Sequence, residues 1–181
     1  MPPDIRAAYE KIQHGLAQMK RGLEQAERGL VAATAAIFDA GGQKLLLTRR
    51  ADNGRWCLPG GQLEPGESAA EGCARETLQE TGLAIRLTRL IGVYSRPHQV
   101  AAYPDGHRYQ VVALIFAAAV AGGQPRLSAE TTAWGWFGHD ELDSLDLMEH
   151  HRQRLPDIFA RQAAAFFSEV VCPANKDGLS P

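Results

Sequence analysis

The sequence predicts an α/β domain with an extra helix at its N-terminus, and three observations support this fold class. Apolar residues recur with helical spacing over the first thirty positions. Short strand patterns separated by glycine-rich turns begin at Val31. A capping-box motif at Ser68 marks the start of an internal helix. With 181 residues, 45% of them apolar and 22% charged, the chain suits one domain with additions at its ends.

Charge and cysteine usage exclude several classes of protein. The net charge is −2, and Lys and Arg are spread along the chain, so we expect a small-molecule substrate and no nucleic acid polymer. The three cysteines are far apart and form no Cys-x-x-Cys pair, which argues against a disulfide framework or a zinc site. The N-terminus lacks the apolar core of a signal peptide, so we expect a cytoplasmic protein. The longest apolar run, residues 111–121, is too short to span a membrane and predicts a buried central strand.

Residues 1–30 have the pattern of an amphipathic helix. Two sets of apolar residues each recur every seven positions and together form a helical seam. Beside the seam, Gly15, Gly22 and Gly29 form a column without side chains, although each interior glycine costs a helix about 1 kcal/mol. Such a column lets another backbone approach closely, so one interpretation is a homodimer formed through this helix. The other is a single helix lying over its own domain.

Residues 31–170 are expected to form the main domain. Residues 32–40 and 44–50 flank Gly41-Gly42 and predict a hairpin, which a loop rich in glycine and proline follows. The Ser68-x-x-Glu71 motif starts a helix that should end near Gly82. Further strands are predicted at residues 85–94, 109–120 and 132–137, and a last helix around 153–167. Residues 171–181 read as a disordered tail.

One face of the Ser68 helix carries a group of oxygen ligands. Glu76, Gln79 and Glu80 are three or four positions apart and therefore project together, with Arg75 beside them. Two carboxylates and an amide oxygen near a glycine-rich loop suit Mg²⁺ or Mn²⁺. The alternative interpretation is an ordinary solvated helix face.

The loop and helix together resemble the Nudix box, G-x5-E-x7-R-E-U-x-E-E-x-G-U, where U is a bulky aliphatic residue. Gly61, Glu67 and the stretch RETLQETGL, which begins at Arg75, match seven of its nine positions at the required spacing. The departures are Gln79 in place of a glutamate and Thr77 at an aliphatic position. The lead-in LLLTRRADNGRWCLPGG and the segment LSAETTAWGWFGHDEL are also similar to the family. Residues 1–30 lie outside the resemblance.

The resemblance implies an α/β/α sandwich around a mixed sheet and hydrolysis of nucleoside diphosphate derivatives with Mg²⁺ or Mn²⁺. By the family pattern, Glu76, Gln79 and Glu80 hold the metals together with the backbone carbonyl of Gly60. Arg75 resembles the arginine that orients the box carboxylates, and Glu67 resembles the box glutamate near the helix start. Because Gln79 adds no formal charge, we expect a requirement for millimolar metal or a preference for Mn²⁺.

The catalytic base varies among Nudix enzymes. Glu130 in the segment ETT is the leading candidate here, with Glu76 as the alternative. The expected substrate contacts are Arg50 at a phosphate, Trp56 stacking on a base, Glu67 and Tyr94, although each of these side chains also fits a surface or packing role. Trp134 and Trp136 fit strand packing, and Cys57 and Cys73 fit small apolar core positions.

The neighbouring His150 and His151 read as a solvated helix start. Two other functions stay open from the sequence alone. Because Gln79 replaces a box glutamate, the domain could be a nucleotide sensor that binds without cleaving. It could also be a structural platform whose N-terminal helix docks a partner. No downstream motif specifies the substrate.

Overall fold

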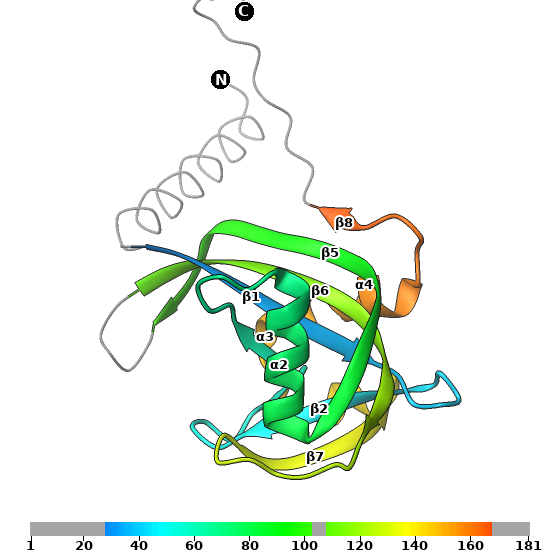
Figure 1. Cartoon of the computed structure of the whole chain (residues 1–181). Coiled ribbons are helices and arrows are strands. Elements are labelled where there is room, and N and C mark those ends of the chain that lie inside the picture. Colours follow the sequence, from blue (N-terminus) through cyan, green and yellow to red (C-terminus); the bar gives the residue numbers. More distant parts are fainter. Residues whose placement is uncertain (1–27, 103–107, 168–181) are drawn as a thin grey trace, which may run out of the picture.

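The computed structural model describes residues 28–102 and 108–167 (Figure 1). Along the chain, one long helix separates the first four strands from the next three, and short helices precede a final two-residue strand. In order they are β1 (Arg28–Ile37), β2 (Lys44–Arg50), β3 (Trp56–Cys57), β4 (Gly60–Gln62), α2 (Ala69–Thr81), β5 (Leu83–Ala102), β6 (Arg108–Gly123), β7 (Thr131–Gly138), the 3-10 helix η1 (Leu142–Ser144), α3 (Glu149–Arg152), α4 (Leu155–Ala160) and β8 (Phe166–Phe167).

The strands form two sheets. The larger sheet has the order β4-β1-β6-β5-β8 and is mixed, because β1 runs parallel to β6 while β5 runs antiparallel to it. The smaller sheet, β3-β2-β7, is antiparallel. The apolar run at residues 111–121 lies in β6, between β1 and β5, which confirms the predicted central position. The run is only partly buried, because Ala113, Ile115 and Ala118 are buried while Val120 is exposed.

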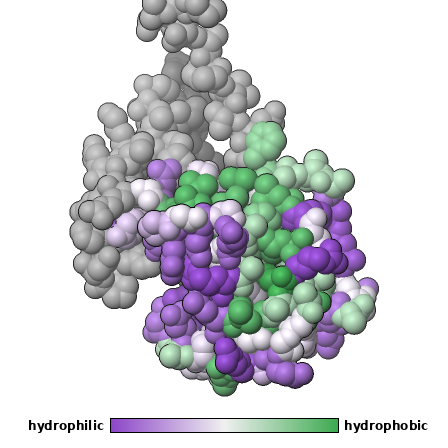
Figure 2. Space-filling view, viewed as in Figure 1, coloured by the Kyte–Doolittle hydropathy of each residue, from purple (hydrophilic) through white to green (hydrophobic). Residues whose placement is uncertain are grey.

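Helices pack on both sides of this strand layer. Cys73 of α2 shares a buried apolar cluster with Ala35 and Ile37 of β1. Leu155 and Ile158 of α4 belong to a second cluster on the opposite side. Figure 1 shows α2 in front of the larger sheet and α3 behind it. The predicted α/β/α sandwich is therefore confirmed, and hydrophilic residues cover much of the face on which α2 lies (Figure 2).

The predicted bounds of α2 are confirmed by its two caps. The Ser68 hydroxyl accepts from the Glu71 N–H, and the Glu71 carboxylate accepts from the Ser68 N–H, so two of the helix's first N–H groups are satisfied. At the other end Gly82 has a φ of 74°, a left-handed conformation that glycine adopts at low cost. No helix among the described residues combines the length and apolarity needed to cross a membrane.

Near the N-terminal part of the domain, one prediction needs correction and another holds only in part. β1 begins at Arg28, so Gly29 and Leu30 belong to a strand and not to the predicted helix. The turn at Gly41-Gly42 forms, with the Asp39 N–H donating to the Lys44 carbonyl. An antiparallel bridge between Phe38 and Leu45 closes this turn, so the hairpin forms next to it. Beyond the bridge the strands separate, because β1 pairs with β4 and β6 while β2 pairs with β3 and β7. The remainder of the predicted helix, residues 1–27, lies outside the described residues.

The predicted last helix is present but shorter than expected. α4 starts at Leu155 and ends at Ala160, because Pro156 can occupy only a first turn and Arg161 adopts a left-handed φ of 49°. The chain then extends, and β8 pairs parallel with β5. The predicted disordered tail at residues 171–181 lies outside the described residues.

Candidate active site

Glu80 connects α2 to the Pro-Gly-Gly turn. Its carboxylate accepts a hydrogen bond of 2.9 Å from the Gly60 N–H, and the residue is only 5% exposed. Burial raises the pKa of Glu80 to about 7; the Gly60 N–H opposes this rise, and the nearby Glu76 carboxylate adds to it. A bound cation would stabilise the charged form of this buried carboxylate and so lower its pKa.

Glu76 reaches the same turn one residue later. A Cβ atom at Gly61 would lie 2.7 Å from the Glu76 carboxyl carbon, so the carboxyl group packs directly on the glycine backbone. A side chain at position 61 would therefore displace the Glu76 carboxyl group. Glu76 and Glu80 therefore converge on Gly60 and Gly61, as the Nudix box resemblance implied.

Arg75 holds the surrounding oxygen ligands in place. Its Nε and Nη2 atoms donate to the Glu67 carboxylate at 2.5 and 2.9 Å, and Nη1 donates to Glu76 at 2.7 Å. The Arg75 guanidinium also holds the pKa of Glu67 at about 2, well below its usual range. Both Glu67 oxygens are thus engaged within the protein. These bonds give Glu67 a positioning role through Arg75, and its predicted substrate contact stays a prediction.

Gln79 lies on the exposed side of the same cluster. Its amide oxygen accepts from Arg75 Nη1 at 3.0 Å, so the oxygen remains beside the carboxylates although the formal charge is lost. Within the described residues, no three His, Cys, Asp or Glu side chains gather as a metal-binding group. The helix instead offers two carboxylates and an amide. This set fits Mg²⁺, which is usually held by one or two carboxylates together with waters and substrate phosphates.

The loop that carries Glu130 is tied to the last turn of α2. The Thr131 hydroxyl donates to the Glu80 carbonyl at 3.1 Å, and the Arg126 N–H donates to the Thr81 carbonyl at 2.8 Å. The exposed Glu130 carboxylate is near enough to contribute to the raised pKa of Glu80. The structure therefore brings Glu130 to the carboxylates of the box, although 50 residues separate it from Glu80 in sequence.

Arg50 approaches the same carboxylates from β2. A register irregularity lies between Arg49 and Arg50, at the end of the β2–β7 ladder. The guanidinium forms a two-pronged pair with Asp52, at 2.9 and 2.7 Å, and keeps 39% of its side-chain surface exposed. Its charge opposes the rise in the pKa of Glu80. Arg50 is thus placed where a phosphate held near Glu80 could meet it.

Trp56 and Tyr94 make packing contacts, which replace the substrate contact predicted for the buried Tyr94; the contact predicted for the half-buried Trp56 stays a prediction. The Trp56 ring packs edge-on against Phe137, with ring centroids 4.8 Å apart, beside the core cluster. Tyr94 is 9% exposed, and its hydroxyl donates to Asp157 at 2.9 Å. The predictions for four other residues are confirmed: Cys57 and Cys73 are buried, and Trp134 and Trp136 pack against the cluster that contains Cys73.

The two histidines of α3 differ from the prediction of a solvated helix start. His151 is 6% exposed, and its Nδ1 atom has no hydrogen-bond partner among the described atoms. The His150 ring lies 4.3 Å from the His151 ring, centroid to centroid, and Arg154 is 4% exposed. The sequence shows only that His and Arg residues gather after residue 149. This pattern does not predict that His151 and Arg154 are buried.

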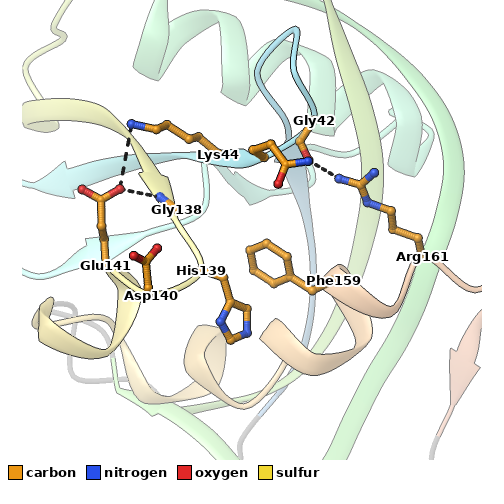
Figure 3. Close-up of a pocket in the computed structure, with 9 residues that line it drawn as sticks. Gly42, Lys44, Gly138, His139, Asp140, Glu141, Phe159 and Arg161 are labelled. Carbon is orange, nitrogen blue, oxygen red and sulfur yellow. Dashed lines mark hydrogen bonds and ion pairs between the residues drawn. The ribbon is translucent and has the colours of Figure 1, made fainter.

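A separate cavity lies at the opposite end of β2, next to Lys44 (Figure 3). It measures about 730 Å³ and is lined by the turn at Gly42, residues 138–141, Phe159 and Arg161. Lys44 and Glu141 approach to 4.0 Å across it, and Arg161 donates to the Gly42 carbonyl. Because Lys44 begins β2 and Arg50 ends it, this cavity is distinct from the α2 carboxylates and provides positions for control substitutions.

This chain is similar to known proteins in sequence and in fold. The family model of the NUDIX domain matches residues 29–158. A MutT-like protein from Streptomyces ambofaciens is 41% identical over 117 residues, which cover 65% of this chain and 64% of that protein. An ADP-ribose pyrophosphatase from Methanocaldococcus jannaschii is 35% identical, covering 56% of this chain and 59% of that protein. The chain thus spans less than two thirds of the length of these two relatives.

Two further proteins extend the comparison. The nucleoside triphosphatase NudI from Escherichia coli is 30% identical over 118 residues, which cover 61% of this chain and 84% of that protein. Among solved structures, a NUDIX hydrolase from Nitrosomonas europaea superposes with a TM-score of 0.60 at 28% identity, covering 73% of this chain and 89% of that chain.

Proposed function

Because this chain belongs to the Nudix hydrolase family, we propose that it hydrolyses the diphosphate bond of a nucleoside diphosphate derivative with the help of Mg²⁺ or Mn²⁺. One observation carries the proposal. Glu80 bonds to the Gly60 N–H and Glu76 packs on Gly61, so two carboxylates meet the glycine turn of the box while Arg75 orients their neighbours. A solvated helix face would not require this convergence.

The proposed metal ligands are Glu76, Glu80, the Gln79 amide oxygen and the Gly60 carbonyl. A bound divalent ion would neutralise diphosphate oxygens and lower the pKa of a coordinated water. Arg75 keeps Glu76 and Gln79 in position through its two hydrogen bonds. Arg50 supplies positive charge to a phosphate oxygen, since phosphoryl transfer depends mainly on positioning and electrostatic stabilisation.

Glu130 is the proposed base. The water oxygen attacks one phosphorus, the bridging P–O bond breaks toward the leaving phosphate, and Glu130 accepts the proton of the water. We expect Glu130→Gln to lower kcat about 100- to 1000-fold with little change in KM, because a positioned base contributes roughly this factor. Steady-state kinetics would test this, with Glu141→Gln beside the distant cavity as the control. If kcat is nearly unchanged, the base lies elsewhere, with Glu76 the next candidate.

The relatives do not define the substrate class, because they are named for different substrates. One similar protein is an ADP-ribose pyrophosphatase and another a nucleoside triphosphatase, and both substrates contain a nucleoside-linked diphosphate. The decisive experiment incubates the protein with ADP-ribose, nucleotide sugars and nucleoside triphosphates, plus Mg²⁺ or Mn²⁺, and measures product release. We expect metal-dependent release from at least one class. Complete inertness across the panel would contradict the proposed hydrolysis.

Gln79 should weaken metal activation. Changing Gln79→Glu restores a formal negative charge beside Glu76 and Glu80, so we expect the metal concentration for half-maximal activity to fall about tenfold. Activity measured against Mg²⁺ and Mn²⁺ concentration tests this. Gln79→Met, which removes the oxygen but keeps the bulk, should raise the requirement. An unchanged metal dependence in both variants would show that position 79 is not a ligand.

A nucleotide sensor is the second candidate function. It is favoured by the absence of a three-acid cluster among residues 28–102 and 108–167, because two carboxylates can bind a metal–nucleotide complex too weakly for turnover. Tight binding of ADP-ribose or a nucleoside triphosphate without product release would support it. We prefer the hydrolase because Glu76, Glu80 and Arg75 keep the arrangement that the chemistry requires.

A homodimer formed through residues 1–27 and a cytoplasmic location are also proposed. The dimer proposal rests on the heptad spacing and the glycine column in the sequence. Light scattering on a truncated protein tests the dimer. Since β1 starts at Arg28, this truncated protein should begin at Arg28. If light scattering gives the truncated protein the same number of subunits as the full chain, residues 1–27 do not mediate assembly.

A further inference from the structure

An apolar patch lies on the larger sheet, on the same face as α2. Along β1, Ala33, Ala35 and Ile37 belong to the buried cluster that this face forms with α2. Side chains alternate between the two faces of a strand, so Val31 points to the same side, but it is 41% exposed. The Val31 carbonyl accepts from the N–H of Leu63, in the loop before α2. The patch therefore begins where the cluster under α2 ends.

The patch continues across the neighbouring strands. Val31 pairs with Val112 of β6. Leu114, two residues further along β6, lies on the same face and pairs with Val93 of β5, which in turn pairs with Phe167 of β8. These five residues, Val31, Val112, Leu114, Val93 and Phe167, are called the sheet patch below.

The sheet patch is only partly covered. Phe167 is 71% exposed and Val31 is 41% exposed, while the three residues between them are half-buried. Neither of the two buried clusters formed by the described residues includes any of the five. In the view of Figures 1 and 2, hydrophobic residues gather above α2, toward β8. Contiguous apolar surface of this kind, unlike a single exposed residue, is typical of an interaction site.

The segment before β1 has the length and the pattern to cover this patch. Residues 1–27 lead directly into β1, which starts at Arg28 and reaches the patch at Val31. A helix of this length, as the sequence predicts, would be about 40 Å long. The patch crosses four strands and is therefore about 15 Å wide. The apolar seam of the predicted helix consists of Ile5, Tyr9, Ile12, Leu16, Met19 and Leu23.

Other occupants have less in their favour. Residues 168–181 follow Phe167 directly, but they contain Pro173 and the polar run 175–178 and no repeating apolar seam. A second copy of the chain has to bind from solution, whereas a segment joined at Arg28 has a millimolar effective concentration. The homodimer proposed above can use the column of Gly15 and Gly22, which lies beside the seam. The two contacts are therefore compatible.

We propose that residues 1–27 dock through their apolar seam onto the sheet patch of the same chain. Apolar burial drives this contact. The segment contains four acidic and four basic side chains, so its net charge gives no attraction to the domain. Docking should therefore persist at high salt, which screens exposed charges.

Amide hydrogen exchange on the full chain tests the docking. We expect the amides of residues 1–27 to be protected, and Val31→Asp to speed their exchange at least about tenfold, because a carboxylate in an apolar contact is costly. Val120→Asp is the matched control. Val120 lies near the other end of β6, outside the sheet patch, and is 44% exposed. Protection that is unchanged in Val31→Asp, or lost equally in both variants, would overturn the docking.

A photochemical cross-link identifies the occupant and does not depend on how well Val31→Asp folds. p-Benzoylphenylalanine replaces Phe167, which keeps an aromatic side chain at this exposed position, and the irradiated full chain is digested for mass spectrometry. We expect a bond from position 167 to residues 1–27 within a single chain. The same replacement at Leu127, which is 53% exposed outside the patch, should not reach them. A cross-link that joins two chains, or none to residues 1–27, would overturn docking within the chain.

The docking is separable from the other proposals. Contact within one chain does not depend on protein concentration, so the exchange of residues 1–27 should be equal in dilute and concentrated protein. Protection that disappears on dilution would overturn the docking and assign the protection to the homodimer. Neither measurement uses substrate or metal, so a failure of the proposed hydrolysis leaves this inference unchanged.

Discussion

Replacing Glu80 with glutamine should abolish hydrolysis and, at the same time, stabilise the metal-free protein at alkaline pH. The loss of activity follows from removing one of two carboxylates that meet the glycine turn. Metal-ion stabilisation contributes several kcal/mol to such reactions, so we expect kcat/KM to fall about a thousandfold or more. Activity should not return at high metal concentration if Glu80 is a direct ligand.

The gain in stability follows from the pKa of Glu80, which rises from an ordinary 4.5 to about 7 on folding. The folded state holds the proton more tightly, so this group's contribution to stability is complete below pH 4.5 and is lost as pH rises through 7. At pH 8 the buried charge should cost the metal-free protein up to about 3 kcal/mol. Glutamine stays neutral and avoids this cost.

Thermal unfolding in EDTA at pH 5 and pH 8 measures the effect. We expect the Tm of Glu80→Gln, relative to the natural protein, to be higher at pH 8 than at pH 5. Glu130→Gln removes only a minor contributor to the raised pKa of Glu80 and should show a much smaller difference. If the two proteins differ by the same amount at both pH values, the Glu80 carboxyl is not buried at a raised pKa.

Replacing Gly60 with alanine should prevent stable folding. Gly60 has a φ of 138°, and an added Cβ would lie 2.3 Å from the Ala33 carbonyl oxygen and 2.6 Å from the Thr34 Cα of β1. These backbone atoms of β1 cannot move away without disturbing the pairing of β4 with β1. We expect a loss of at least about 4 kcal/mol, a large part of the stability of an ordinary domain. Denaturant unfolding measures it.

Gly66→Ala is the matched control. Gly66 also has a positive φ, 94°, but an added Cβ there meets no atom within 4 Å. It should cost only the conformational strain, about 1 kcal/mol. If Gly60→Ala is no more destabilising than Gly66→Ala, the close approach of β4 to β1 is not a determinant of the fold.

Local signals in the sequence were sufficient to predict the bounds of α2 and the helix face that carries Glu76 and Glu80. The capping box at Ser68 and the left-handed glycine at Gly82 are defined by neighbouring residues, so the helix and its exposed face could be placed without tertiary information. The Nudix resemblance supplied the pairing of that face with the glycine turn. Glu130 could be connected to the site only through the resemblance, since its approach depends on the long-range bond from Thr131 to Glu80.

The errors came from features that depend on tertiary structure. The hydroxyl of Tyr94 suggested a substrate contact, but it donates a hydrogen bond to Asp157 of α4, which is distant in sequence. His151 follows charged neighbours and is still buried, in a helix whose preceding residues 146–148 pair with the backbone of Trp56. The split of β1 and β2 into separate sheets is decided by β6 and β7, which come much later in the chain.

The ties between α2 and the segment after β6 have a consequence for motion. The carbonyls of Glu80 and Thr81 at the helix end accept from Thr131 and Arg126, so the segment cannot lift away without leaving helix carbonyls unpaired. Turnover therefore should not rely on this segment swinging open to discharge products. Amide hydrogen exchange should instead show Arg126 and the last turn of α2 becoming accessible together, as one cooperative unit.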